Sequence, residues 1–494
     1  MSDSAIQFLL DQQFVELTDY NPNMTILQYL RENQGLTGTK EGCASGDCGA
    51  CTVVLASVEH GQLVYKNINS CIAFIGALHG KQLITVEHLQ SEDGQLHPVQ
   101  QAMVDNHGSQ CGFCTPGFIM SSFALHKSNG SPNYSPSKEE VNEALAGNLC
   151  RCTGYRSIIA AACETSPEKD KSADKFTDNQ AQTMATLIKI KTQRHYAPDD
   201  DNHYYAPDTV NQLGAYLIVH PEATMVAGGT DLALMVTQNL KSIDKLVYLG
   251  NVAELKAIEH NDYGWKVGAA VTYHDFTPHI ATHYPDMAAM IERIGSTQIR
   301  NLGTIGGNIG NASPIGDMPP VLIALDASVE IQTGDLQKGG TCRTIALEDY
   351  FKDYKVTDLA QSEFIRAINI PKPVHLSQLK VYKISKRIDD DISAVLAAIN
   401  ITVEDNCIKA VSIAFGGMAA IPKRAKNCEN ALVNQPFNQQ TVDNAKAALF
   451  NDFMPMSDVR ASKDYRMLVA QNLIEKCFIE WQQRNIETRV VNYA

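Results

Sequence analysis

The chain has 494 residues, 44% of them hydrophobic and 19% charged, which is ordinary for globular protein and leaves room for about three domains. Its 41 basic and 55 acidic residues give a formal net charge of −14, which excludes general nucleic-acid binding because phosphate contact needs a basic face. No membrane span is expected, since the chain has no uncharged apolar run of about 18 residues. The N-terminus lacks the basic start and apolar run of a signal peptide, so a cytoplasmic location is expected.

Residues 1–88 are predicted to form a small α+β domain. Thr25 can cap a helix that ends near Glu32, because the apolar residues between them share one face. A loop rich in glycine and cysteine, residues 42–51, follows this helix. Apolar runs around short turns predict strands at 6–10, 14–17, 52–58, 63–69 and 84–86.

In residues 89–165 the apolar residues recur with a helical period, which predicts a compact four-helix bundle. Pro98 and Pro116 suit first-turn positions, and Ser137 can cap the third helix. The helices are expected at 98–107, 116–126, 138–146 and 155–164. Cysteines fall at the helix ends, where a bundle can bring them together.

The rest of the chain divides into a linker and two further regions. Residues 166–183 are polar and charged and are predicted to be the linker. Residues 184–375 mix strands with helices and carry two glycine-rich stretches. A last region, residues 378–490, ends in a helical pattern over 465–483.

Thirteen cysteines are distributed unevenly, and eight of them form two groups before residue 153. In a reducing compartment, clustered cysteines more often bind metal than form disulfides. The scattered cysteines are expected to be small buried residues, and they are Cys163, Cys342, Cys407, Cys428 and Cys477.

The first group has the spacing of a plant-type ferredoxin loop for a [2Fe–2S] cluster. Cys43, Cys48 and Cys51 follow the pattern C-x4-C-x2-C, and Cys71 stands further along the chain. The loop must wrap tightly around two irons, and its glycines let backbone N–H groups point at the sulfurs. A structural zinc site is the alternative, although zinc sites more often use pairs of cysteines. The glycines concerned are Gly42, Gly46 and Gly49.

The second group combines a C-x2-C pair with a C-x-C pair. Cys111 and Cys114 precede the second expected helix, and Cys150 and Cys152 lie between the third and the fourth. Each pair alone could bind zinc or be redox-active. Together, in two helix-linking loops that follow a ferredoxin-like domain, they predict a second [2Fe–2S] cluster.

Three segments around these cysteines resemble signatures of the xanthine oxidase family of molybdenum hydroxylases. Residues 41–52 (EGCASGDCGACT) resemble its first-cluster signature, and residues 110–117 (QCGFCTPG) and 147–155 (GNLCRCTGY) resemble its second-cluster signature. The resemblance implies that the second cluster lies nearest the molybdenum and takes electrons first. It also implies that Gln110 lies close to the pterin, where a helix-end hydrogen bond is the alternative role.

A flavin site is predicted from two glycine-rich stretches, although no G-x-G-x-x-G stands between a strand and a helix. Residues 226–232 (VAGGTDL) follow an apolar strand, and their exposed backbone N–H groups can cradle a pyrophosphate; a tight structural turn is the alternative. Residues 303–320 (GTIGGNIGNASPIGDMPP) are too rich in glycine for a regular helix interior. This second stretch resembles the FAD-binding signature of the same family.

The resemblance also implies individual FAD contacts. Asp317 would lie near the ribose or phosphate end, or would be only a turn residue. Lys383 would lie near the flavin ring and stabilise reduced, anionic flavin, or would be a solvated lysine. Ile294 stands where some relatives carry an aromatic residue that stacks on the flavin. The remaining expected contacts are Val226, Ala227, Gly228, Gly229, Thr230 and Asp231 at the pyrophosphate, with Thr304, Gly307 and Asn308.

The implied fold is α+β and multidomain. It comprises a ferredoxin-like β-grasp [2Fe–2S] domain, a four-helix-bundle [2Fe–2S] domain and an α+β FAD-binding domain. The FAD-binding domain is of the vanillyl-alcohol-oxidase and CO-dehydrogenase-flavoprotein type, with a C-terminal α+β subdomain. Residues 455–466, near the end of that subdomain, are expected to be structural.

In this order the domains resemble the small subunit of bacterial two-subunit xanthine dehydrogenases, which convert hypoxanthine and xanthine to urate. That resemblance implies a molybdopterin-binding large subunit as partner in a dimer of heterodimers, NAD+ as acceptor and no catalytic side chain in this chain. Three alternatives stay open: a partner that hydroxylates another heterocycle or an aldehyde, a stand-alone iron–sulfur flavin reductase, and a metal-bearing sensor protein.

Overall fold

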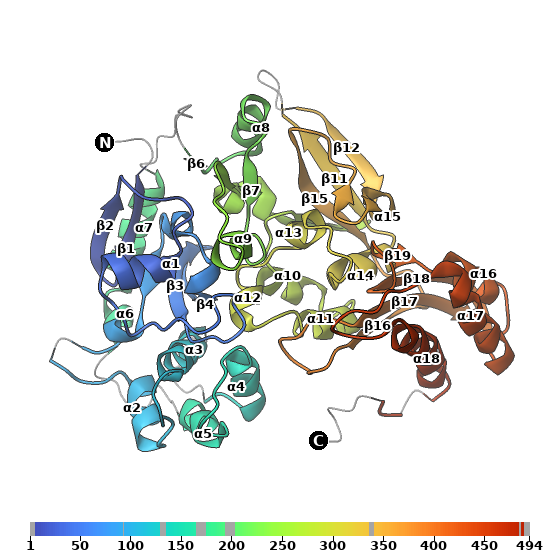
Figure 1. Ribbon diagram of the computed structural model, residues 1–494, viewed down its shortest axis with the longest axis horizontal. Helices are drawn as coiled ribbons and strands as arrows, with labels where there is room; N and C mark the ends of the chain where they lie inside the picture. The colour runs from blue at the N-terminus through green and yellow to red at the C-terminus, as the bar shows by residue number, and fades with distance from the viewer. Residues whose placement is uncertain are drawn as a thin grey trace. The chain divides into compact units, whose positions relative to one another are not determined.

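The computed structural model describes residues 5–91, 93–128, 135–164, 174–192, 203–334, 340–483 and 486–488. The chain forms two compact units, and each unit is assembled from segments that are separate in the sequence (Figure 1). Unit 1 comprises Met1–Asp208, Glu222–Asn251 and Gly295–Gly303. Unit 2 comprises Thr209–Pro221, Val252–Ile294 and Thr304–Ala494.

Unit 1 begins with a five-stranded sheet in the order β2-β1-β5-β3-β4. Its strands are β1 (Ile6–Leu10), β2 (Gln13–Leu17), β3 (Thr52–Glu59), β4 (Gln62–Asn69) and β5 (Gln82–Ile84). β1 pairs with β5 in parallel, and the other pairs are antiparallel. The expected helix is α1 (Ile26–Gln28), which Thr25 caps and which continues as a π-helical turn. Four of the predicted strands are therefore confirmed, whereas the strand expected at 84–86 lies at Gln82–Ile84 and is followed by a 3-10 helix at Val86–His88.

The four helices of the second region are confirmed, and their ends differ from the expected ones by at most two residues. They are α2 (Pro98–Asp105), α3 (Thr115–Ser128), α4 (Lys138–Leu145) and α5 (Arg156–Glu164). Ser137 accepts from Glu140 N–H, while Glu140 accepts from Ser137 N–H, so α4 begins with a capping box. The buried aromatic residues of α3, Phe118 and Phe123, join the bundle to β3 and β4 in one core.

The prediction of a linker at 166–183 is wrong for the part that the structure describes; residues 166–173 lie outside it. α6 (Lys175–Asp178) and α7 (Gln180–Thr192) form helices there. Phe176 is 1% exposed and packs edge-on against Phe123, and α7 buries Leu187 and Ile190 in the same core. The polar composition of this part of the chain obscured its few apolar residues. Because these residues are buried, the two helices are packed as part of unit 1.

Two short elements complete unit 1. The parallel sheet β6-β8-β7 contains β6 (Tyr204–Tyr205), β7 (Thr224–Val226) and β8 (Leu246–Tyr248), and α9 (Ala233–Thr237) follows β7. The four-residue helix α12 (Thr297–Arg300) packs on β4 and α4. A core of Cys51, Cys71, Val226, Ala233 and Leu246 joins this sheet to the ferredoxin-like domain.

Unit 2 contains an antiparallel sheet in the order β12-β11-β15-β10-β9. Its strands are β9 (Ile258–Asn261), β10 (Gly264–Gly268), β11 (Ser328–Thr333), β12 (Cys342–Ala346) and β15 (Glu363–Pro371). A large apolar core joins this sheet to most of the neighbouring helices. The helices and the small hairpin of this part are α8 (Val210–Val219), α10 (Tyr273–Ile280), α11 (Pro285–Ile291), α13 (Ile305–Gly310), α14 (Met318–Ala324), α15 (Leu347–Tyr350), β13 (Phe351–Asp353) and β14 (Val356–Thr357).

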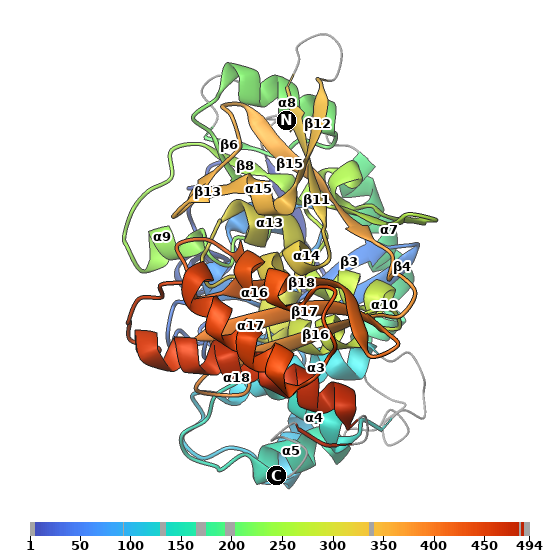
Figure 2. The same cartoon turned by 90° about the vertical axis from the view of Figure 1, so that its right-hand side faces the viewer.

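A second antiparallel sheet of unit 2 runs in the order β16-β17-β18-β19. Its strands are β16 (Ser377–Ile384), β17 (Val395–Glu404), β18 (Cys407–Gly416) and β19 (Lys423–Arg424), and the helices α16 (Lys426–Leu432), α17 (Gln439–Asp452) and α18 (Lys463–Gln482) cover one face (Figure 2). Successive residues of β17 enter different cores: Leu396 and Ala398 face α14, whereas Val395 and Ala397 face the three C-terminal helices. None of the described helices has the length and hydropathy to cross a membrane.

We predict that unit 1 loses stability as the pH falls below about 6.5. Burial lowers the pKa of His97 to about 3 and that of His126 to about 4, whereas the unfolded chain binds these protons near pH 6.5. Between these pH values the unfolded state holds more protons, so acidification favours unfolding. Hydrogen exchange of peptides from α2 and α3 in the cofactor-free chain should accelerate from pH 6.5 to pH 4. Equal protection at both values, after correction for intrinsic exchange, would contradict the prediction.

Candidate electron-transfer sites

The first cysteine quartet lies in unit 1, on the loop before β3 and in a turn after β4. The Cys48 thiol, followed by the Cys71 thiol, hydrogen-bonds to Cys43 and lowers the pKa of Cys43. Cys71 likewise lowers the pKa of Cys51, while the pKa values of Cys48 and Cys71 rise because they act as the donors. The thiol contacts therefore link the four sulfurs in the order Cys48, Cys43, Cys71 and Cys51.

The loop backbone is shaped around these sulfurs. The backbone N–H groups of Ser45 and Asp47 point at Cys43 Sγ, at 3.4 and 3.3 Å. Gly46 and Gly49 have φ values of 86° and 67°, which side-chain-bearing residues rarely adopt. A Cβ on Gly42 would lie 2.8 Å from Cys48 Sγ. These N–H dipoles favour anionic sulfur, as the ligands of an iron–sulfur cluster require.

The second quartet joins the loop before α3 to the loop between α4 and α5. Contacts between thiols pair Cys114 with Cys150 and Cys111 with Cys152. Burial, with the Cys150 contact, raises the pKa of Cys114 to about 12. Burial opposes ionisation of Cys150 too, but hydrogen bonds from Thr153 and Cys152 outweigh it and lower the pKa to about 7.

The sulfur of Cys150 accepts three hydrogen bonds from the two residues that follow Arg151. Its Sγ accepts from the N–H of Cys152 (3.4 Å), the N–H of Thr153 (3.4 Å) and the hydroxyl of Thr153 (3.2 Å). In the described ranges, no three Cys, His, Asp or Glu side chains converge as ligands of one metal ion. Each quartet therefore brings four thiols into contact, which is the number of protein ligands that a [2Fe–2S] cluster needs and that a structural zinc ion also takes.

The two cysteine loops touch each other within unit 1. Leu149 N–H, next to Cys150, donates to the carbonyl oxygen of Cys48 at 3.0 Å. A Cβ on Gly49 would lie 2.3 Å from the carbonyl oxygen of Gly147, so the backbones approach as closely as glycine allows. One hydrogen bond thus joins Cys48 to Leu149, the residue before Cys150.

The glycine-rich stretch 226–231 lies against the first quartet in unit 1. It connects β7 to α9, as expected, and Gly229 has a φ of 73°. A Cβ on Gly229 would lie 3.4 Å from the carbonyl oxygen of Ile72, the residue after Cys71. Gln238 Nε2, just after α9, donates to the carbonyl oxygens of Cys43 (3.1 Å) and Ala44 (2.9 Å). A group held by this stretch would therefore lie beside the first quartet.

In unit 2, part of the stretch 303–320 is a helix, which corrects the expectation that its glycines exclude one. Thr304 caps α13 by accepting from Gly307 N–H at 3.0 Å. Gly306 lets α13 pack closely, since a Cβ there would lie 2.5 Å from Ala269 Cβ. Asn308 Oδ1 is buried with no partner among the described residues, so it is available to a bound group.

Asp317 and Lys383 form a buried ion pair within unit 2. Lys383 Nζ lies 2.5 Å from Asp317 Oδ2, with 2% and 8% of the two side chains exposed, so Lys383 is not a solvated lysine. Ser393 donates to Asp317 Oδ1 at 2.6 Å. Arg293 donates to the Lys383 carbonyl oxygen at 3.1 Å and so fixes the backbone of β16. Asp317 stands at the start of α14 but does not cap it.

Tyr273 adds a second unsatisfied polar atom to this part of unit 2. Its hydroxyl is buried with no partner in the described part of the chain. Burial, with the nearby Asp317 carboxylate, raises its pKa well above the usual range. Buried polar atoms without partners are rare in folded proteins. The Tyr273 hydroxyl and Asn308 Oδ1 are therefore both free to contact a bound polar group.

Several other predicted residues have structural positions. Ile294 is half-buried against the core of unit 2. Arg466 is buried, and it binds the Ala394 and Gly417 carbonyl oxygens and Asp458, which supports a structural role for 455–466.

Cys428 and Cys477 are buried, as expected, but Cys342 is exposed and Cys163 and Cys407 are intermediate. The expectation of burial is therefore wrong for those three.

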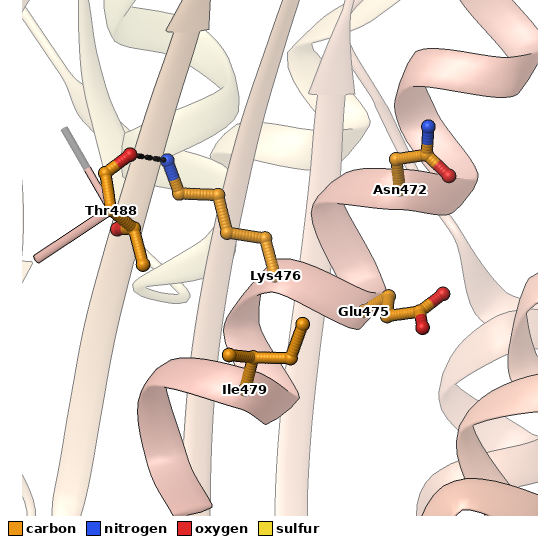
Figure 3. Close-up of a pocket in the computed structure, with 5 residues that line it drawn as sticks. All are labelled: Asn472, Glu475, Lys476, Ile479 and Thr488. Carbon is orange, nitrogen blue, oxygen red and sulfur yellow. Dashed lines mark hydrogen bonds between the residues drawn. The ribbon is translucent and has the colours of Figure 1, made fainter. Parts of the chain in front are cut away.

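An open pocket on α18 contains none of the predicted site residues. Lys476 Nζ donates to the Thr488 carbonyl oxygen at 3.1 Å across this pocket (Figure 3). Its other lining residues are Asn472, Glu475 and Ile479.

Sequence reasoning also missed functional candidates outside the motifs, Ser393 and Tyr273 among them, because single hydroxyl groups carry no spacing pattern.

Comparison with known proteins assigns a domain family to most of the chain. Residues 10–75 match the 2Fe-2S iron-sulfur cluster binding domain, and residues 85–163 match the [2Fe-2S] binding domain. Residues 196–373 match the FAD binding domain in molybdopterin dehydrogenase, and residues 380–481 match the CO dehydrogenase flavoprotein C-terminal domain. The predicted fold class is confirmed, as are two [2Fe–2S] domains and an FAD domain.

Curated relatives match the chain almost from end to end. The xanthine dehydrogenase of Emericella nidulans is 33% identical over 91% of this chain, and xanthine dehydrogenase 1 of Arabidopsis thaliana is 30% identical over 95%. The chain spans only 36% and 39% of the lengths of these relatives.

Two solved structures each match more than half of the chain. A chain of the Cu,Mo-CO dehydrogenase matches 57% of this chain with a TM-score of 0.52 and 26% identity, and 97% of that chain is covered. Quinoline 2-oxidoreductase from Pseudomonas putida 86 matches 59% of this chain with a TM-score of 0.52 and 25% identity, and 100% of that chain is covered. The matched portion therefore constitutes nearly all of one chain in each of those two structures.

Proposed function

We propose that this chain, which is the iron–sulfur and flavin portion of a xanthine dehydrogenase-family molybdenum hydroxylase, conducts electrons from a molybdenum-bearing partner through two [2Fe–2S] clusters to FAD and NAD+. One observation carries the proposal. The second quartet is joined to the first by the Leu149–Cys48 hydrogen bond, and the first adjoins the stretch 226–231 in the same unit. Such a row of contacts suits sequential electron transfer.

We assign the cluster ligands to the eight cysteines of the two quartets. [2Fe–2S] clusters supply one-electron carriers, and FAD couples single electrons to two-electron hydride transfer. The chain itself supplies placement and electrostatics, because backbone N–H groups stabilise sulfur charge at both quartets. The proposed ligands are Cys43, Cys48, Cys51 and Cys71 in the first quartet, and Cys111, Cys114, Cys150 and Cys152 in the second.

The FAD contacts are proposed for each unit separately. In unit 1, we assign the pyrophosphate to the backbone N–H groups and small side chains of residues 226–231. In unit 2, Asn308 offers a free buried oxygen, and the Lys383–Asp317 pair offers a fixed cation. A cation beside the flavin favours the reduced, anionic form. The proposed residues are Val226, Ala227, Gly228, Gly229, Thr230, Asp231, Thr304, Gly307, Asn308, Asp317 and Lys383.

The partner and its substrate follow from the relatives. The curated relatives are xanthine dehydrogenases, so we propose that the partner oxidises hypoxanthine and xanthine to urate. The CO dehydrogenase and quinoline 2-oxidoreductase matches cover nearly all of one chain in each structure but only 57% and 59% of this chain, which supports a division of the domains among separate chains. We therefore propose a separate molybdopterin-binding chain and a dimer of heterodimers. The cytoplasmic location, the expected domain boundaries and the nearness of the second quartet and Gln110 to the molybdenum stay predictions.

The test is purification of the affinity-tagged chain, without harsh washing, from the cells in which it occurs naturally. The proposal predicts a co-purifying molybdopterin-binding chain and NAD+ reduction that depends on xanthine or hypoxanthine. Turnover of quinoline, an aldehyde or carbon monoxide instead would keep the relay and change the substrate. A molybdenum-free chain that oxidises NADH alone would replace the proposal with a flavin reductase.

A further inference from the structure

We infer that Gln298 is a positioning residue for electron transfer between the two cysteine quartets. The inference rests on the proposed function, because it assumes that both quartets carry clusters. Gln298 lies on α12, in the nine-residue segment Gly295–Gly303 that belongs to unit 1, whereas the chain on either side belongs to unit 2. Its side chain is 0% exposed and lies far in sequence from either quartet.

The side-chain amide of Gln298 reaches both cluster loops. Its Nε2 donates to Thr52 Oγ1 at 3.1 Å, and Thr52 follows the ligand candidate Cys51. The same nitrogen lies 3.0 Å from Asn148 Oδ1, two residues before Cys150, and 3.3 Å from Ser121 Oγ on α3. One buried nitrogen is therefore shared by the first-quartet loop, the second-quartet loop and the helix that begins after Cys114.

The groups that Gln298 contacts are also bonded to one another. Asn148 Nδ2 donates to the Gly49 carbonyl oxygen at 3.0 Å, and Thr52 Oγ1 donates to the same oxygen at 2.7 Å. Ser121 Oγ donates to Asn148 Oδ1 at 2.7 Å. Each hydroxyl thus donates to a distinct acceptor, and the two N–H groups of Gln298 are shared among three oxygens, those of Thr52, Ser121 and Asn148. Thr52, Ser121 and Asn148 are at most 3% exposed, which strengthens these bonds.

Glycines bring the loops and α12 into close contact at this network. A Cβ on Gly147 would lie 2.2 Å from Ser296 Cβ and 2.6 Å from Gln298 Oε1. A Cβ on Gly117 would lie 2.2 Å from the Gly49 carbonyl oxygen. No side chain can enter these spaces, so the amide of Gln298 fills the gap that remains between the loops.

Hydrogen bonds also anchor α12 itself to unit 1. Asn301 Nδ2 donates to the carbonyl and side-chain oxygens of Asn67, both at 2.9 Å. Arg300 Nη2 lies 3.3 Å from Glu143 Oε1 on α4. These contacts hold α12 in place, so the side chain of Gln298 has a fixed position between the two cysteine loops. By holding Asn148 against Thr52 and Gly49, it keeps Leu149 N–H on the Cys48 carbonyl oxygen.

Gln298→Met tests this role, because methionine keeps the length and volume of glutamine but has no N–H to donate. Gln101→Met is the matched control, since Gln101 is an exposed glutamine whose amide nitrogen donates to Asp105 Oδ1 on α2 and to neither cysteine loop in the described part of the chain. The cofactor-loaded chains are reduced anaerobically and compared by electron paramagnetic resonance, which reports the magnetic interaction between the two reduced clusters. Electron exchange between the clusters is measured after rapid one-electron reduction.

Gln298→Met should retain about four irons per chain, weaken the interaction between the clusters and slow electron exchange between them about tenfold. Gln101→Met should match the parent chain. A Gln298→Met chain with parental splitting, midpoint potentials and exchange rate would overturn the inference and leave Gln298 a structural residue. If that variant fails to fold, Ser121→Ala removes only the hydroxyl that fixes Asn148 and must show the same spectroscopic change. A parent chain without two cluster signals would instead overturn the proposed function, and the inference with it.

Discussion

Replacing Cys150 by alanine is expected to lower the iron content from about four to about two per chain while FAD is retained. Cys150 is buried and contacts Cys114, and three hydrogen bonds from Cys152 and Thr153 stabilise charge on its sulfur. Alanine removes the ligand together with the acceptor of those bonds, so one iron loses half of its protein thiolates. Iron and flavin analysis with low-temperature paramagnetic resonance measures the loss of one cluster signal.

Cys163→Ala is the matched control for this prediction. Cys163 lies on α5 in the same bundle and contributes to neither quartet. The control should keep about four irons and both signals. If Cys150→Ala also kept both signals, Cys150 would not be a ligand, and the assignment of the second quartet would fail.

Replacing Asp317 by asparagine is expected to destabilise unit 2 by about 3–5 kcal/mol, because it leaves the buried Lys383 ammonium without a counter-charge. Both tryptophans of the chain, Trp265 and Trp481, lie in unit 2, so tryptophan fluorescence follows the unfolding of this unit. Urea unfolding of the cofactor-free chain should show the transition at lower denaturant concentration. FAD retention should fall as well, since the fixed cation loses its position.

Two variants control for the loss of a carboxylate. Asp262→Asn removes the charge of a fully exposed residue that pairs with Lys372, and the unfolding transition should not move. The double variant Asp317→Asn with Lys383→Met should recover stability, because replacing both partners of a buried ion pair by uncharged groups costs less than orphaning one. Equal transitions in the parent, Asp317→Asn and Asp262→Asn would contradict the account of the pair.

Local signals predicted the ferredoxin-like domain and the bundle well. Caps and prolines marked the helix starts at Pro98 and Lys138, and the period of apolar residues gave their lengths. Cysteine spacing selected the eight quartet members, and the structure brings the members of each quartet into contact. These features depend mostly on residues that are close together in the sequence, so they can be predicted without knowledge of tertiary contacts.

Long-range packing could not be predicted from the sequence. α6 and the first turn of α7 were expected to be part of a linker, because only a few buried residues, such as Phe176, distinguish them from a solvated segment. α13 forms despite its glycines because Thr304 caps it and Gly306 packs against Ala269. The return of residues 295–303 to unit 1 depends on contacts of Gln298 with residues up to 246 positions away. No periodic pattern encodes such contacts.

Counting the electrons that the cofactor-loaded chain accepts tests the relay most directly. The chain, purified anaerobically and free of any molybdenum partner, is titrated with dithionite while absorbance and paramagnetic resonance are recorded. The account predicts about four electrons per chain, one for each [2Fe–2S] cluster and two for FAD. Uptake of only about two electrons, with a flavin signal and no cluster signals, would contradict the electron relay and leave a simple flavoprotein.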